Sequence, residues 1–305
     1  SCEDNIPIVN GHPLPTPEWI EDQGLQGFPH VFGQPSGCTI NWEWHDFPIE
    51  VCDGTIKYRR EWSVVDWCIG DGFAYNQIIK VLDETGPAFD CPDNLTVSTD
   101  AFTCCGTVNL PDVIVEDNCS HISNLSGMIV VREQFTGQVI NMVPINGTLE
   151  DFPGNNWWNR DTLANFGWTP CLPVGTHTVT YLVEDDCANT SVCNFALTIS
   201  DLVPPVAACD ETTTVAIGQN DPFDCYDGSD ACDFGGVTWV KATTFDDGSH
   251  DNCNGVKFSI RRMDPYSNCI LDLCESSLAT AESDSIKFYC CEVGTTQTVI
   301  LSVYQ

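Results

Sequence analysis

Basic residues are scarce in this chain of 305 residues. Lysine and arginine together number 11, against 44 aspartates and glutamates, so the formal net charge is −33. Binding to nucleic acid or to an anionic membrane surface depends on clusters of basic side chains, and this composition therefore disfavours both. An acidic surface of this kind attracts cations and keeps a protein soluble.

Several sequence signals are also missing. No apolar run approaches the roughly 20 residues that a membrane-spanning helix requires. The sequence contains no Gly-x-Ser-x-Gly elbow, no His-Glu-x-x-His pair and no phosphate-binding loop, and it therefore gives no support to an enzyme. It has no Cys-x-x-Cys pair either, which makes zinc a poor explanation for its cysteines.

Cysteine is abundant, with 19 residues in the chain. This density predicts an oxidising compartment outside the cell and a framework of disulfides. Because the count is odd, at least one thiol is free or is bonded to a cysteine outside these residues.

A repeated frame organises the chain. Segments 66–91 and 185–209 both contain an Asp-x-Cys turn followed by an Asp-x-x-x-Pro-x-x-x-Cys hinge. The hinge aspartates, Asp83 and Asp201, are 118 positions apart. Such internal repetition indicates tandem modules.

Short alternating apolar stretches, for example at 57–66, 178–183 and 256–260, predict the strands of β-sandwiches. We therefore expect an all-β fold of tandem immunoglobulin-like, disulfide-rich sandwiches arranged end to end. The predicted modules are 1–88, which begins with an aromatic and proline-rich segment, 89–204, with an insertion near 133–172, and 205–305.

The third module is expected to lack its last strand. Thr298 aligns with Thr178, so that Gln305 falls where Asp185 stands in the second module. A following copy of the chain would then supply the missing strand by strand addition.

The segment V-G-T-H-T-V-T-Y-L-V-E-D-D-C-A-N-T-S-V-C-N-F-A-L-T-I-S-D-L-V-P-P at 174–205 resembles the hyalin-repeat (HYR) module, an immunoglobulin-like sandwich. Ala188 replaces the glycine that this module usually has before its asparagine, here Asn189. The stretches 246–253 and 260–263 look like repeats in large surface adhesins of gliding bacteria that use type IX secretion. The resemblance implies an extracellular spacer, stalk or adhesive unit.

The resemblance also implies disulfide pairs. Those that suit the module best are Cys119 with Cys187 and Cys91 with Cys193. By analogy, Cys209 and Cys253 would bond to cysteines outside the chain.

Two acidic turns suggest calcium, because Ca²⁺ prefers oxygen ligands on short turns. The candidate ligands are Asp185, Asp186 and Asn189 in one turn and Asp246, Asp247 and Asp251 in the other. The alternative is that aspartate and asparagine are present only because they form good turns.

Two further kinds of site are weighed. Thr162 and Ser285 match the short O-glycan acceptor motif of such bacteria, and the adjacent Trp157 and Trp158 suggest a ligand platform.

We expect a non-enzymatic structural repeat of an extracellular filament or adhesin stalk, with neighbouring copies and surface glycans as partners. It would require no cofactor, although calcium would fit the acidic turns. The alternative is a module that binds carbohydrate or protein through exposed aromatic side chains.

Overall fold

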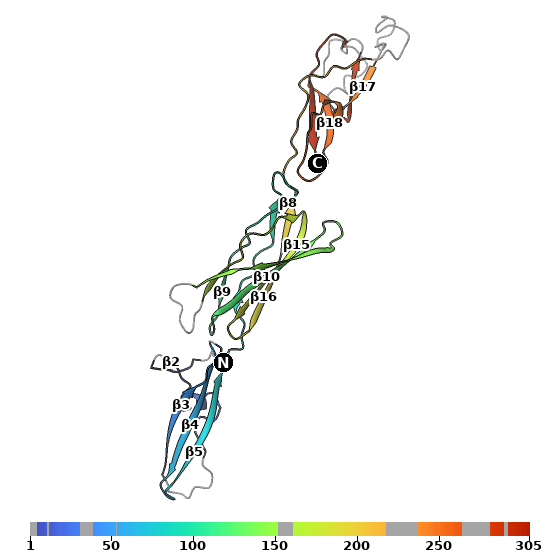
Figure 1. Cartoon of the computed structure of the whole chain (residues 1–305). Helices are drawn as coiled ribbons and strands as arrows, with labels where there is room; N and C mark the ends of the chain where they lie inside the picture. Colours follow the sequence, from blue (N-terminus) through green and yellow to red (C-terminus); the bar gives the residue numbers. More distant parts are fainter. Residues whose placement is uncertain are drawn as a thin grey trace. The chain divides into compact units, whose positions relative to one another are not determined.

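A computed structural model describes residues 5–10, 12–30, 39–52, 54–151, 161–217, 237–263, 281–289 and 292–305. The described chain is built almost entirely of antiparallel β-strands (Figure 1), which confirms the predicted all-β class. Among the described helices, none has the length and apolar character needed to cross a membrane.

The chain divides into two compact units, which are described separately. Unit 1 comprises Ser1–Val97 and Thr107–Ile199, and unit 2 comprises Ser98–Gly106 and Ser200–Gln305. The three modules with boundaries at residues 88 and 204 stay a prediction.

One part of unit 1 is a three-stranded antiparallel sheet. Its strands are β3 (Ile40–Pro48), β4 (Ile56–Asp66) and β5 (Asp71–Val81), in that order. Side chains of β4 alternate as the sequence predicts, with Trp62 and Val64 buried and Ser63 and Val65 exposed. Alternate residues of a strand point to opposite faces, so one face of this sheet is covered and the other faces solvent.

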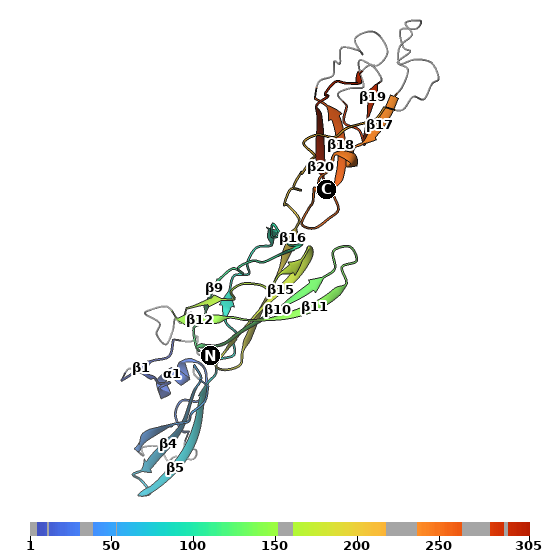
Figure 2. The ribbon, with the colours of Figure 1, turned by 45° about the horizontal axis from the view of Figure 1, so that its top comes forward.

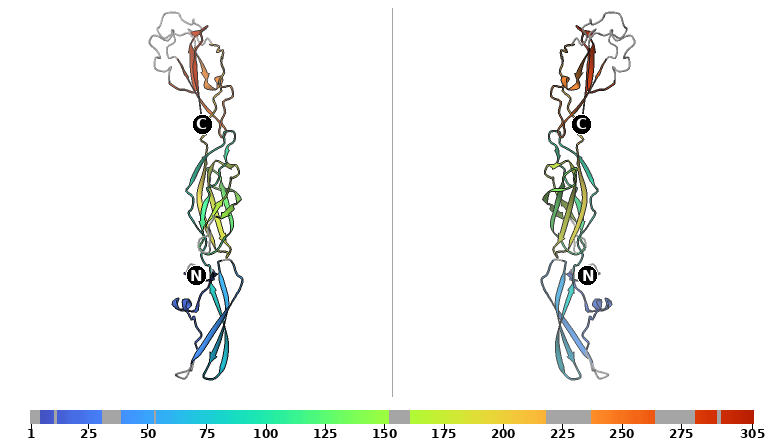
Figure 3. Two further views of the ribbon diagram at one scale, coloured as in Figure 1. Left: turned by 90° about the vertical axis from the view of Figure 1, so that its left-hand side faces the viewer. Right: turned by 90° about the vertical axis from the view of Figure 1, so that its right-hand side faces the viewer.

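The covered face of this sheet packs against the aromatic, proline-rich N-terminal segment. That segment forms β1 (Ile8–Val9), β2 (His12–Pro13) and α1 (Pro17–Asp22), and Figure 3 shows α1 beside the sheet. Arg60 is completely buried, where it donates to both carboxylate oxygens of Asp46 and to the carbonyl oxygen of Pro15. These acceptors replace most of the hydration of the buried guanidinium, although its Nη1 atom has no hydrogen-bond partner among the described residues.

The rest of unit 1 is a β-sandwich (Figure 2). One sheet has the order β11 (Val139–Asn146), β10 (Ile122–Arg132), β15 (Gly175–Asp185), β16 (Thr190–Ser200) and β7 (Leu95–Ser98). The other has the order β12 (Thr148–Asp151), β13 (Thr162–Asn165), β9 (Val113–Glu116) and β6 (Ala88–Phe89), and the short β14 (Leu172–Pro173) precedes β15.

The core of the sandwich lies between its two sheets. Val115, Ile129, Val179 and Leu197 are fully buried there. Burial of each such side chain stabilises the fold by roughly 1.5–3 kcal/mol. Tyr181 is buried in the same core, and its hydroxyl donates to the carbonyl oxygen of Pro111 at 3.1 Å.

The segment predicted as an insertion, 133–172, is part of this sandwich. It supplies β11 to one sheet and β12 and β13 to the other, each in antiparallel register with its neighbours. These short strands carry weak alternation and many turn residues, so the sequence pattern did not separate them from a loop. Trp157 and Trp158, predicted here as a ligand platform, lie outside the described residues.

Unit 2 contains two strand pairs and the short β8 (Cys105–Gly106). The pairs are β17 (Val237–Lys241) with β19 (Ser285–Tyr289) and β18 (Lys257–Arg262) with β20 (Val299–Tyr304). A single 3-10 turn, η1 (Ala242–Phe245), follows β17. Ile260, Ile286 and Phe288 form part of the core of unit 2. Unit 2 also has a buried ion pair, in which Arg262 donates to Glu292 at 2.7 Å.

Candidate functional site

The Asp-x-Cys motif forms the same turn wherever the structure describes it. In each copy the aspartate carboxylate accepts a hydrogen bond from the backbone N–H of the cysteine two residues later, at 2.7–3.0 Å. The four pairs are Asp66 and Cys68, Asp117 and Cys119, Asp185 and Cys187, and Asp251 and Cys253. All four cysteines are disulfide-bonded. Aspartate forms such turns readily because its short side chain reaches the backbone N–H two residues on.

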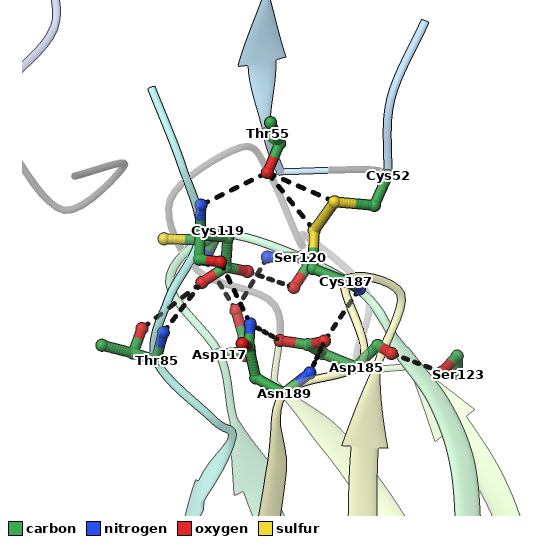
Figure 4. Close-up of a disulfide and its surroundings, with 11 residues drawn as sticks. Cys52, Thr55, Thr85, Asp117, Cys119, Ser120, Ser123, Asp185, Cys187 and Asn189 are labelled. Atoms are coloured by element: carbon green, nitrogen blue, oxygen red, sulfur yellow. Dashed lines mark hydrogen bonds between the residues drawn. A yellow bond between two sulfur atoms is a disulfide. The ribbon is translucent and has the colours of Figure 1, made fainter. Parts of the chain in front are cut away.

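One of these turns joins the two parts of unit 1 covalently. Cys187, in the turn between β15 and β16, is bonded to Cys52, which lies between β3 and β4 (Figure 4). Their Cα atoms are 5.1 Å apart and their sequence separation is 135 residues. The Thr55 hydroxyl oxygen lies 3.2 Å from the Cys52 sulfur and accepts from the Asp83 backbone N–H at 3.3 Å.

This pairing corrects the expectation that Cys187 would bond to Cys119. Cys119 is disulfide-bonded, but not to Cys187. The prediction considered cysteines within one repeat, and Cys52 belongs to the segment before the hinge. The pair Cys91 and Cys193 agrees with the structure.

In unit 2 a second expectation is wrong. Cys253 needs no cysteine outside the chain, because it is bonded to Cys104, with Cα atoms 4.4 Å apart. Cys209 is free and exposed.

Three carboxylates are buried near the Cys52–Cys187 disulfide: Asp83, Asp117 and Asp185 are 7%, 6% and 1% exposed. Figure 4 shows Asp117 and Asp185 beside this disulfide. Asp83 accepts from the hydroxyl of Ser120 and the backbone N–H of Thr85. These hydrogen bonds compensate part of the free-energy cost of removing the charges from water.

Asn189 forms hydrogen bonds with two of these three aspartates, Asp83 and Asp185. Its amide nitrogen donates to Asp185 Oδ2 at 2.8 Å and to the carbonyl oxygen of Asp83 at 3.3 Å. Its backbone N–H donates to Asp185 Oδ1 at 2.8 Å. The hinge residue Asp83 is thereby tied to the turn between β15 and β16.

The surroundings of Asp117 disfavour its negatively charged, ionised form. Burial raises the pKa of Asp117 above its ordinary value of 3.8, and the nearby Asp83 and Asp185 carboxylates raise it further. Hydrogen bonds from the backbone N–H groups of Ser120 and Cys119 act in the opposite direction. None of the described members of this cluster is a lysine or an arginine.

The cluster contains few free ligand atoms for a metal. Ligand atoms of Asp83, Asp117 and Cys119 lie within 4.8 Å of one another, yet the Cys119 sulfur is in a disulfide and is not a thiolate. Both carboxylate oxygens of Asp185 already accept hydrogen bonds. Ca²⁺ takes 6–8 oxygen ligands, so the described geometry fits turn formation better than calcium binding.

The predicted calcium ligands fall into separate turns. Asp185 and Asn189 are in contact, whereas Asp186 is exposed and its backbone N–H bonds to the carbonyl oxygen of His121. In unit 2, Asp246 accepts from the Ser249 N–H, and hydrogen bonding with the Ser249 side chain, followed by its backbone N–H, lowers the pKa of Asp246.

Asp251 accepts from the backbone N–H groups of Asn254 and Cys253, which lowers its pKa as well. Asp247 is exposed. Calcium binding at either turn stays a prediction.

The two predicted glycan acceptors differ in access. Thr162 is 1% exposed, and its hydroxyl donates to Asp151 at 3.1 Å, so the folded chain does not present it to an enzyme. The motif could not show this, because burial depends on the partner sheet. Ser285 is partly exposed in β19 and stays a prediction.

Comparison with known proteins gives no family. The sequence matches no family model and no characterised protein. The chain shares 13% identity and a TM-score of 0.27 with zebrafish RET cadherin-like domains 1 to 4, covering 74% of this chain and 51% of that one. For mouse clustered PcdhgC3 EC1-3 the identity is 11% and the TM-score 0.21, covering 51% and 46%.

A third solved structure, protocadherin gamma B7 extracellular cadherin domains 1-4, has 10% identity and a TM-score of 0.17, covering 92% of this chain and 95% of that chain. The chain thus spans about half the length of the first two proteins. These likenesses are too distant to assign a family or a function, and the hyalin-repeat resemblance has no matching family model.

Ala188 provides a direct test of the turn after Asp185. Its φ of 66° lies in the left-handed region, where a Cβ atom is costly and glycine is not. We expect Ala188→Gly to raise the free energy of unfolding by up to about 1 kcal/mol in urea titrations. The matched change Ala196→Gly, in the extended strand β16, should lower it; a loss of similar size at both positions would contradict this account.

Asp117→Asn tests the electrostatics of the buried cluster. Asparagine keeps an oxygen acceptor for the two backbone N–H groups but removes the charge. Because the pKa of Asp117 is raised on folding, wild-type stability increases as pH falls through the range above 3.8. The variant should therefore be more stable than wild type at neutral pH, and the difference should vanish below about pH 4.

Thermal unfolding between pH 3 and pH 8 measures this difference. Asp246→Asn is the matched control, because its lowered pKa adds stability at neutral pH that is lost on acidification. A variant of Asp117 that is less stable than wild type at every pH would show that the carboxylate is favourable as an anion.

Proposed function

We propose that the chain is a non-enzymatic structural module of an extracellular surface assembly, such as a filament or an adhesin stalk, in which it transmits load. The observation that carries the proposal is the interleaving of its disulfides. The pairs Cys52–Cys187, Cys91–Cys193 and Cys104–Cys253 overlap along the sequence, with separations of 135, 102 and 149 residues.

Interleaving creates a covalent path that bypasses most of the chain. From Cys52 it crosses to Cys187, follows the chain to Cys193, crosses to Cys91, follows the chain to Cys104 and crosses to Cys253. Between Cys52 and Cys253, a force applied at the two ends is therefore borne by three disulfides and two short segments. Strand β7 lies within one of these segments, whereas the sandwich strands outside the two segments are shielded from extension.

The disulfides also support the extracellular location. Ten of the eleven described cysteines are bonded. Disulfides at this density form and persist in oxidising compartments. The type IX secretion route and the hyalin-repeat family stay predictions from the sequence.

The proposal requires no cofactor, because disulfides and the apolar cores hold the described chain together. Calcium would be an addition rather than a requirement. Neighbouring copies of the chain are the proposed partners in the assembly, and no finding supports surface glycans.

A binding module remains the second candidate, for one observation. Trp42, Phe73 and Tyr75 lie on the same face of the three-stranded sheet and are 42%, 54% and 57% exposed. This is the face that carries buried Trp62 and Val64, so the three aromatic side chains form its exposed margin, where the N-terminal segment does not cover the sheet completely. Exposed aromatic surface of this kind is typical of contact with a ligand or another protein.

Single-molecule stretching of the chain, held at its two ends, tests the structural proposal. In the oxidised chain, the contour length between Cys52 and Cys253 should not be gained on stretching, because the disulfides bridge most of this segment. Reduction should add at least roughly 600 Å of contour length, at about 3.4 Å per extended residue. Cys209→Ser, which removes a free thiol, is the matched control and should leave the oxidised trace unchanged. Full extension of the oxidised chain would contradict the proposal.

A further inference from the structure

The chain changes sheets between β6 and β7 of the sandwich. β6 pairs with β9, whereas β7 belongs to the opposite sheet beside β16. The crossing segment is held there by the Cys91–Cys193 disulfide and by Asn94 Oδ1, which accepts from the Ala196 N–H at 2.8 Å. Pro92, in the middle of the crossing, has no N–H to continue the first sheet.

The crossing leaves the edge of β9 incompletely covered. β6 pairs only with Val115 and Glu116, so among the described residues Val113 and Ile114 have no strand partner on that side. Beside this edge is an open groove with a volume of 710 Å³, and Phe89 and Leu95 form part of its apolar wall. An uncovered edge offers backbone N–H and C=O groups for strand addition.

The rim of the groove is acidic. Asp90, Asp93, Asp112 and Glu116 line it, all are exposed, and no lysine or arginine is among the lining residues. None of these carboxylates has an ion-pair partner within the part of the chain that the structure describes. A cationic partner would therefore find its charges unopposed.

We propose that this groove binds an extended peptide segment that carries basic side chains. The peptide backbone pairs with the edge of β9 beside Val113 and Ile114. Because side chains of an extended peptide alternate, one set enters the apolar groove while the other reaches the carboxylates of the rim. This site goes beyond the load-bearing function, although the Cys91–Cys193 disulfide that holds the crossing is also one of the interleaved pairs.

The charge of the chain argues against a second copy as the occupant. The chain has only 11 basic residues, and Arg60 and Arg262 are buried in ion pairs. A second copy would therefore bring few accessible cations to this acidic rim, so the groove is not where neighbouring copies of the chain would join. The occupant we infer is a basic segment of another protein.

A defined peptide provides the first test. We would titrate the full chain with a ten-residue peptide of alternating lysine and valine, labelled for fluorescence anisotropy, at low and at high salt. Binding should be measurable and should weaken as salt screens the exposed charges. A peptide with glutamate in place of lysine should not bind, and methylation of alternate backbone nitrogens should weaken binding because it removes donors.

Charge variants of the groove provide the second test. The triple change Asp90→Asn, Asp93→Asn and Asp112→Asn should weaken binding about tenfold. The matched triple Glu43→Gln, Asp71→Asn and Glu150→Gln alters exposed residues of unit 1 elsewhere and should change binding by less than about twofold. Equal weakening by both triples would show diffuse attraction to an acidic protein and would overturn the proposal.

Ile114→Lys gives a test that does not remove carboxylates. The side chain is 53% exposed, so the fold should tolerate lysine, and far-ultraviolet circular dichroism checks this. The added cation beside the edge should weaken binding of the lysine peptide. The proposal is overturned if Ile114→Lys leaves binding unchanged, if the peptide does not bind at millimolar concentration, or if sedimentation shows that the groove instead joins two copies of the chain.

Discussion

The hydrogen bond from a cysteine backbone N–H to the aspartate two residues before it is the interaction on which the rest of this structure depends. It fixes a tight turn and sets the direction in which the cysteine leaves it. Cys187 and Cys253 leave two such turns to form long-range disulfides with Cys52 and Cys104. A hydrogen bond between residues two positions apart thus positions the disulfides that hold distant segments together.

The acidic composition shapes both the surface and the interior. Three buried aspartates lie near the Cys52–Cys187 disulfide. Hydroxyl, amide and backbone donors, rather than cations, offset the free-energy cost of burying their charges. Neutral donors offset this cost less completely than a paired cation would. The covalent crosslink beside it compensates, because it limits the conformations available to the unfolded chain and contributes about 2–4 kcal/mol.

Much of the fold follows from the sequence pattern, because strand alternation and turn chemistry are local. The faces of β4 and the shared Asp-x-Cys turns are of this kind. The Cys91–Cys193 pair spans 102 residues and is implied only by the resemblance to the hyalin-repeat module. The partner of Cys187 is not local, since 135 residues separate it from Cys52 and no repeat relates them. The strands at 139–165 and the uncovered edge of β9 also depend on how two sheets meet, which periodicity does not encode.

The account makes covalent connectivity the central property of the molecule, and disulfide mapping tests it most directly. The full chain would be digested without reduction, after free thiols are blocked, and its linked peptides identified by mass spectrometry. The account predicts peptides that join Cys52 to Cys187, Cys91 to Cys193 and Cys104 to Cys253, and a blocked thiol at Cys209. A peptide joining Cys119 to Cys187, or Cys104 bonded within its own sequence neighbourhood, would break the interleaving and contradict it.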